Sequence, residues 1–134
     1  MTQVVVPVRY PLSDHSRETL AEAIHLAEEE DATLTVLHVD LYQNAKRVTR
    51  SQLKRAVEEE FGRLSNARYA VRQALLVEEA ILEEAAGEDA DIVVIGKKQA
   101  GRWRDMIRRL IDDPDIEGFL RQELDCDVIT VSTV

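Results

Sequence analysis

The residues best suited to bind a ligand follow one apolar stretch. Residues 92–95 (Ile-Val-Val-Ile) form an uninterrupted apolar run, typical of a strand that is buried on both faces, and Gly96 lets the backbone turn after it. The segment 97–109 then holds six cations and one anion, a charge of +5, in a chain whose net charge is −9. Cations placed at the carboxyl end of a buried parallel strand favour an anionic ligand. This stretch therefore predicts an anion site.

Catalytic and metal signatures are not found in the sequence. Three histidines and one cysteine show no metal-ligand spacing, and neither a Walker A motif nor Gly-x-Gly-x-x-Gly occurs. His38 and Asp40 could relay a proton, but a histidine inside a strand is more often a core or rim residue. No acid and base stand at a convincing spacing. We therefore expect no enzyme activity, no metal and no cofactor.

The elements that must position the anion site alternate along the chain. Strand patterns cover residues 4–8, 33–39, 67–73, 92–95 and 128–134. Four helical patterns separate them: one capped by Ser13 or Asp14, one with a Thr49–Gln52 capping box, one at 77–86 with Gly87 as its stop, and one after Asp113. Further helical spacing lies within 103–111. The alternation predicts one α/β domain over residues 1–134, a five-stranded parallel sheet with helices on both faces. Since strands 4–8 and 92–95 are the most apolar, they belong in the centre, which gives the order 3-2-1-4-5.

This topology brings the loops that follow the strands to one rim of the sheet. Twelve of the seventeen cations would lie at this rim. Arg9 follows the first strand, six cations follow the fourth, and five follow the second: Lys46, Arg47, Arg50, Lys54 and Arg55. The candidate ligand-binding residues are Val8, Arg9, Val39, Gly96, Lys97, Lys98, Gly101 and Arg102. The predicted ligand is a small anion or a nucleotide.

Composition limits the setting and the partners. No apolar run approaches the about 18 residues that a membrane helix needs, and strand-like sequence begins at once, so we expect no signal peptide and a cytoplasmic location. The single cysteine, Cys126, excludes an internal disulfide. The net charge of −9 opposes binding to a polyanion, which disfavours nucleic acid as the main partner.

Five segments resemble those of the universal stress protein family. They are VVVPV, SDHSRETLAEAIHLA, TLTVLHV, ADIVVIG and CDVITVS, and they occur in the family's order across the whole chain. The resemblance implies a flavodoxin-like sheet and a homodimer that forms through the last strand. It also implies one of two groups, because some members bind ATP and others do not. Binders carry Gly-x2-Gly-x9-Gly-Ser/Thr after the fourth strand, and commonly an Asp at the end of the first.

The sequence departs from the family's ATP motif. Gly96 matches its first glycine, but Gln99 stands at the second position and Gly101 comes two residues late. The Gly-Ser position falls on Arg109 or, counted back from the last strand, near Pro114. At the end of the first strand, Arg9 replaces the family's Asp. Small residues at these positions let backbone N–H groups close on phosphate oxygens, so we predict that ATP binding in the usual mode is lost.

Three functional accounts of the basic rim follow, beside a structural one in which the arginines within 102–109 only solvate an amphipathic helix anchored by a buried Trp103. In the first, a stress-response module binds a small anion or an altered nucleotide there. In the second, the rim docks an acidic protein surface or RNA. In the third, ATP or AMP binds at a site rebuilt with arginine.

Overall fold

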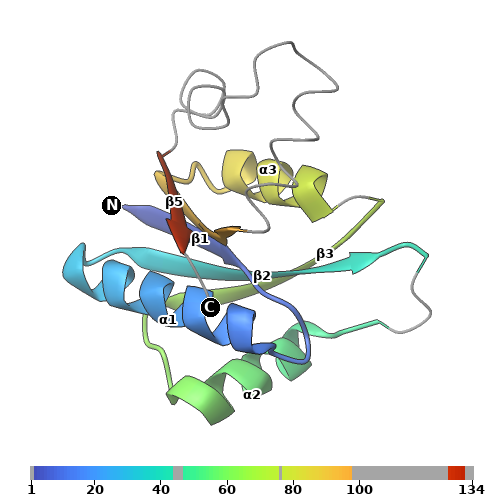
Figure 1. Ribbon diagram of the computed structural model, residues 1–134, viewed down its shortest axis with the longest axis horizontal. Helices are drawn as coiled ribbons and strands as arrows, with labels where there is room; N and C mark the ends of the chain where they lie inside the picture. The colour runs from blue at the N-terminus through green and yellow to red at the C-terminus, as the bar shows by residue number, and fades with distance from the viewer. Residues whose placement is uncertain (1, 44–46, 76, 98–126, 132–134) are drawn as a thin grey trace.

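The computed structural model describes residues 2–43, 47–75, 77–97 and 127–131. Strands and helices alternate, and five strands form one sheet (Figure 1). The strands are β1 (Gln3–Pro7), β2 (Thr33–Leu41), β3 (Ala67–Ala74), β4 (Ile92–Gly96) and β5 (Asp127–Val131). The helices are α1 (Asp14–Glu29), α2 (Arg50–Phe61) and α3 (Val77–Gly87). The predicted helices at 103–111 and after Asp113 lie outside the described residues.

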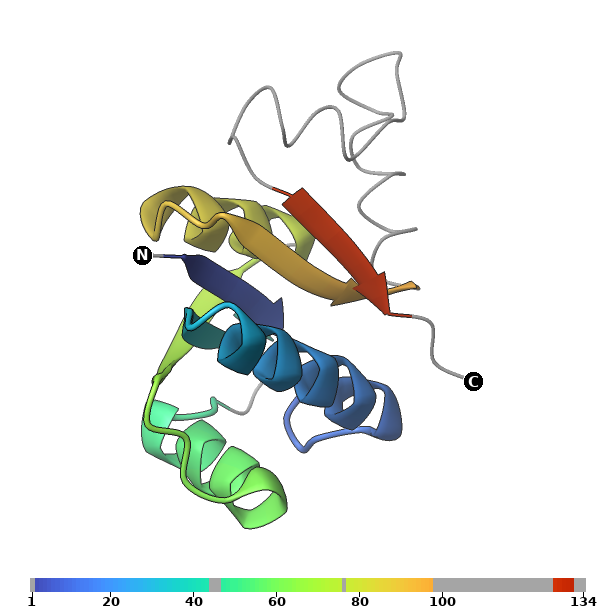
Figure 2. The same cartoon turned by 90° about the vertical axis from the view of Figure 1, so that its left-hand side faces the viewer.

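The sheet has the order β3-β2-β1-β4-β5, and all its strand pairs are parallel. β1 lies in the middle between β2 and β4, and β3 and β5 form the edges. Three consecutive residues of β1 and of β4 are fully buried, as expected for inner strands. Figure 2 shows β5 running beside β4 at one side of the sheet. The predicted fold class and strand order are confirmed.

Helices cover both faces of the sheet. α1 and α2 lie on one face, where Leu20 and Leu53 pack against Val6 and Val36 in the larger core cluster (Figure 1). α3 lies on the other face, where Ile81 joins a smaller cluster with its neighbours on β1, β2 and β4. Parallel strands need such cover because both of their faces are apolar.

Local sequence explains how the first two helices begin. The Ser13 side chain accepts a hydrogen bond from the N–H of Ser16 at 3.1 Å and thereby caps α1. Thr49 and Gln52 form the predicted capping box at the start of α2, each side chain bonding the other's N–H.

Two helices end at aspartates in the left-handed region. Asp31 after α1 has a φ of 50°, and Asp89 after α3 has a φ of 51°. In both cases the next residue donates its N–H five residues back, Ala32 to Ala27 and Ala90 to Ala85, which closes the last turn. The prediction that Gly87 stops the third helix is wrong, because Gly87 is still helical and Asp89 makes the turn.

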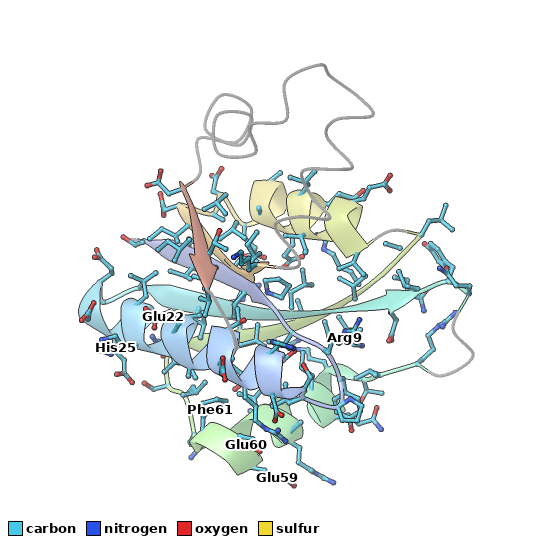
Figure 3. All side chains as sticks on the ribbon, in the orientation of Figure 1. Arg9, Glu22, His25, Glu59, Glu60 and Phe61 are labelled. Atoms are coloured by element: carbon cyan, nitrogen blue, oxygen red, sulfur yellow. The ribbon has the colours of Figure 1, made fainter. Side chains whose placement is uncertain are left out.

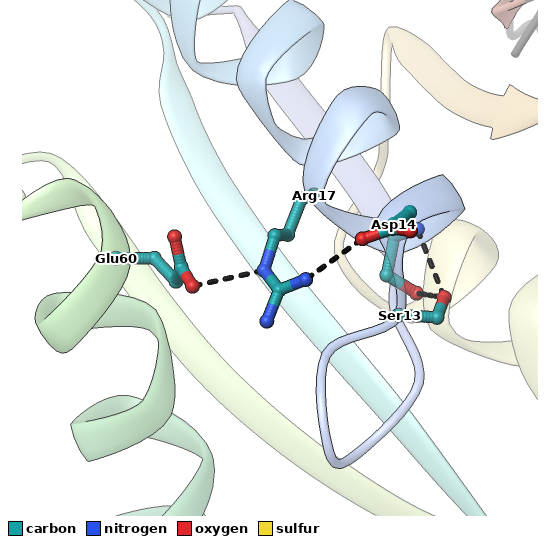
Figure 4. A network of polar contacts seen from close by, with 5 residues as sticks. Ser13, Asp14, Arg17 and Glu60 are labelled. Atoms are coloured by element: carbon teal, nitrogen blue, oxygen red, sulfur yellow. Dashed lines mark hydrogen bonds and ion pairs between the residues drawn. The ribbon is translucent and has the colours of Figure 1, made fainter.

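Ion pairs tie neighbouring elements together at the surface. Arg17 on α1 donates to Glu60 on α2 at 2.9 Å and to Asp14 at 3.0 Å (Figure 4). On the other face, Arg72 of β3 pairs with the buried Glu84 of α3. The cations of these contacts already have partners.

No helix among the described residues is long and apolar enough to cross a membrane. The same residues hold no group of three metal-ligating side chains.

Candidate functional site

The carboxyl ends of β1, β2 and β4 meet at one edge of the sheet. The register pairs Val5 with Val93 and Pro7 with Leu37, and carried forward it sets Val8 beside both Gly96 and His38. The N–H of Val8 donates to the Leu37 carbonyl at 2.8 Å, so the backbone stays paired with β2 beyond the end of β1. The structure thus brings together the predicted residues of three separate strands.

Arg9 is the described cation at the end of β1. Its backbone N–H donates to the Ser16 hydroxyl at 2.9 Å, which holds this turn against the first turn of α1. Its side chain is exposed and makes no ion pair with any described residue (Figure 3). Nearby Arg17 is only partly exposed, and its guanidinium is shared between two carboxylates. Within the described part of this turn, Arg9 is therefore the cation that no carboxylate pairs with and that can bind an anionic ligand.

Gly96 and Lys97 close the edge at the end of β4. A Cβ atom at Gly96 would lie 3.5 Å from the Thr19 hydroxyl oxygen, an ordinary contact, so α1 packs directly beside this turn. Thr19 is buried and donates to the His15 carbonyl at 2.8 Å. Lys97 is exposed. Lys98, Gly101 and Arg102, the other predicted residues of this loop, lie outside the described residues.

A buried polar network underlies the edge. His38 and Asp40 on β2 are only 8% and 4% exposed, and the His38 Nε2 lies 3.0 Å from Asp40 Oδ1. The His38 Nδ1 lies 3.2 Å from the Val8 carbonyl oxygen. Asp40 Oδ2 accepts the N–H of Val48 at 2.8 Å. This network joins the end of β1, the end of β2 and the loop that leads to α2.

The geometry of this network favours a structural role. Both His38 nitrogens face acceptors, and both donate when the ring carries its two protons. Tyr10 covers the ring edge-on, with a centroid separation of 6.2 Å. Because every polar atom of the His38–Asp40 pair meets a protein partner, the geometry favours the rim-histidine interpretation over a proton relay. The sequence offered no sign that Asp40 would anchor Val48.

Val39, the remaining predicted residue, is half-buried on the α3 side of the sheet. It packs with the smaller core cluster, which contains Leu37 and Ile95. At this position it can offer an apolar wall to a ligand.

The predicted basic rim forms only in part. Among its described members, Arg9 and Lys97 follow β1 and β4, while Arg47 turns back to the carbonyls of Leu41 and Tyr42 at 3.5 Å. Lys54 instead lines a groove with Ala67, the first residue of β3. The prediction for Lys54 is corrected because α2 runs away from the edge, and each residue of a helix advances it about 1.5 Å.

Comparison with known proteins supports one family. The sequence profile of the Universal stress protein family matches residues 1–131. A search among curated proteins finds no match to this sequence.

Solved structures of the same family share the fold. The universal stress protein UspA from Lactobacillus plantarum is similar with a TM-score of 0.58 and 17% identity, covering 97% of both chains. The universal stress protein from Archaeoglobus fulgidus in complex with dAMP gives 0.59 and 17%, again with 97% of both chains. A universal stress protein in complex with cAMP gives 0.54 and 19%, with 98% of both chains. At these identities the likeness establishes the fold.

Proposed function

Since the chain belongs to the universal stress protein family, we propose that it is a regulatory module whose sheet edge binds a small anion. The site comprises the turn after β1, with Val8 and Arg9, and the turn after β4, with Gly96 and Lys97. ATP in the family's usual mode is not its ligand. The module performs no catalysis and uses no cofactor.

The observation that carries the proposal is the free guanidinium of Arg9. It stands at the end of a central strand, it is exposed, and no described residue pairs with it. The backbone beneath it is held by the Ser16 hydroxyl and by the Val8–Leu37 hydrogen bond, so the cation projects from a fixed turn. A guanidinium binds phosphate, sulfate or carboxylate oxygens in a bidentate manner.

The loop sequence after β4 argues against ATP. Gln99 stands where ATP binders of the family carry a glycine, and Arg109 stands near their Gly-Ser pair. Asp112, Asp113 and Asp115 follow, and their charges repel a polyphosphate tail at this loop.

The expected affinity for a single anion follows from the number of hydrogen bonds. Two or three charge-assisted hydrogen bonds, less the free-energy cost of immobilising the anion, suggest a Kd in the roughly millimolar to high-micromolar range.

A second candidate function is nucleotide binding at a site rebuilt with arginine. The solved relatives in complex with dAMP and with cAMP support it, since both proteins share this fold. In this alternative Arg9 contacts the single phosphate and Val39 packs against the nucleoside. A nucleoside monophosphate then binds tighter than phosphate alone.

The test is a calorimetric titration with phosphate at fixed ionic strength, using wild type, Arg9→Gln and Arg55→Gln. Arg55 is also an exposed arginine, on α2, and serves as the control for charge. We expect Arg9→Gln to weaken phosphate binding roughly tenfold and Arg55→Gln to leave it nearly unchanged. If both variants lost phosphate affinity equally, the loss would reflect net charge alone, and the proposed site at Arg9 would be wrong. AMP that binds far tighter than phosphate would select the nucleotide alternative.

A further inference from the structure

A cavity lies away from the sheet edge, between α2 and the start of β3. It has a volume of about 380 Å³, within the usual range for small-molecule sites. Arg50, Lys54 and Glu58 form one wall and recur every fourth residue, so they share one face of α2. The floor includes Leu64 and the ring of Tyr69 on β3. We call this cavity the α2–β3 groove.

Tyr69 supplies the feature that calls for a ligand. The residue is 7% exposed, and its hydroxyl has no hydrogen-bond partner among the described residues. An unpaired buried hydroxyl costs free energy, so native proteins nearly always satisfy it with a protein group, water or a ligand. Burial raises the pKa of Tyr69, and the nearby Glu58 carboxylate raises it further. The hydroxyl therefore stays protonated as a donor, and Tyr69 itself is one of the residues that line the groove.

The charges around the groove favour an anion. Arg50, Lys54 and Arg63 are exposed and make no ion pair with any described residue, and Glu58 opposes them, which leaves a net +2. Arg68 also borders the groove, but its guanidinium pairs with Glu88 at 2.6 Å and is not counted. This local excess stands in a chain of net charge −9.

From these observations we infer that the α2–β3 groove binds a small organic anion that joins a ring or apolar body to a phosphate or carboxylate. The ring lies on Leu64 and Tyr69, and the oxyanion accepts from the Tyr69 hydroxyl and from the arginines. The cavity can hold a molecule of this class, and the apolar floor separates it from the simple anion proposed for the sheet edge. The hydroxyl itself is buried in the free protein, so binding requires the side chains that cover it to change rotamer, a motion of picoseconds to nanoseconds for exposed side chains.

The probe for this site is phenyl phosphate, followed by ¹⁵N–¹H correlation spectra of the full chain carrying Arg9→Gln. That background removes the Arg9 guanidinium and so weakens competing binding at the sheet edge, where Lys97 remains. We expect amide shifts along residues 50–58 and 64–69. Shifts confined to the turns at residues 8–10 and 96–97, or no shift at millimolar phenyl phosphate, would overturn the proposal.

Three substitutions in that background sharpen the test. Tyr69→Phe keeps the ring and removes the donor, so phenyl phosphate should bind roughly tenfold more weakly. Arg50→Gln should weaken it roughly two- to fivefold, while Arg55→Gln, the same change on the same helix outside this groove, should not. If phenyl phosphate bound equally well to the Arg9→Gln protein with and without Tyr69→Phe, the proposed role of the hydroxyl would be wrong.

Stability without ligand gives an independent readout. If the hydroxyl has no partner in the free protein, Tyr69→Phe should unfold at the same urea concentration as its parent or at a higher one. A marked loss of stability would show that the hydroxyl already has a structural partner, and that result also contradicts the proposal.

Discussion

Replacing Asp40 tests whether the network beneath the sheet edge holds that edge together. Its carboxylate is nearly buried and accepts two hydrogen bonds, one from Val48 N–H at 2.8 Å and one from His38 Nε2 at 3.0 Å. Asp40→Ala removes both acceptors and leaves both donors behind. Asp40→Asn keeps an acceptor for Val48, and its NH₂ group can donate to Nε2 of a neutral His38 that still donates from Nδ1 to Val8.

The magnitude follows from the two lost bonds. A hydrogen bond to a charged group contributes roughly 1.5–3 kcal/mol, and Val48 N–H is only partly buried, so Asp40→Ala should cost roughly 3–5 kcal/mol. For a chain of this size that corresponds to a decrease in Tm of roughly 10–20 °C. Asp40→Asn should cost about 1 kcal/mol, because the pattern of donors and acceptors is kept.

Urea unfolding followed by circular dichroism measures these differences. Asp14→Ala is the control, since the Asp14 side chain is 94% exposed and its ion pair with Arg17 lies at the surface. We expect little change in the control. An Asp40→Ala variant within 1 kcal/mol of wild type, or an Asp40→Asn variant as unstable as Asp40→Ala, would refute the reasoning.

Three further predictions concern the core, an alkaline transition and assembly. Leu53→Ala should lower the unfolding free energy by roughly 2–5 kcal/mol, because Leu53 is fully buried, whereas Leu75→Ala, at 66% exposed, should change it little in the same urea titration. Since the pKa of Tyr69 is raised in the folded state, the unfolded chain loses this proton first, and the unfolding free energy should fall as pH rises above about 10; Tyr69→Phe should reduce that fall in urea titrations at pH 9 and 11. β5 is an edge strand, so we predict a homodimer through it and a monomer by sedimentation for Thr130→Pro; an unaltered dimer of this folded variant would place the interface elsewhere.

The framework could be predicted because it depends on local patterns. The apolar runs at residues 4–6 and 92–95 predicted two central strands, and the Thr49–Gln52 spacing predicted a helix start that the structure confirms. The strand pattern at residues 128–134 likewise predicted β5, where Ile129 and Val131 both pack against the larger core cluster.

The parts that could not be predicted depend on contacts between distant residues. The His38 ring meets a carbonyl thirty residues earlier in the chain, and Asp40 meets an amide eight residues later. Neither pairing leaves a sequence pattern. The α2–β3 groove likewise arises only when Tyr69 packs beneath α2. Lys54 was assigned to the wrong place because the sequence gives the start of a helix but not the direction of its axis.

The sheet edge as a simple anion site is the central claim, and parallel calorimetric titrations with Mg-ATP and inorganic phosphate test it most directly. At fixed ionic strength we predict phosphate binding at roughly millimolar to high-micromolar affinity, with Mg-ATP binding no tighter. Micromolar Mg-ATP binding that Arg9→Ala abolishes would contradict this account, because it would show a nucleotide site rebuilt around that arginine.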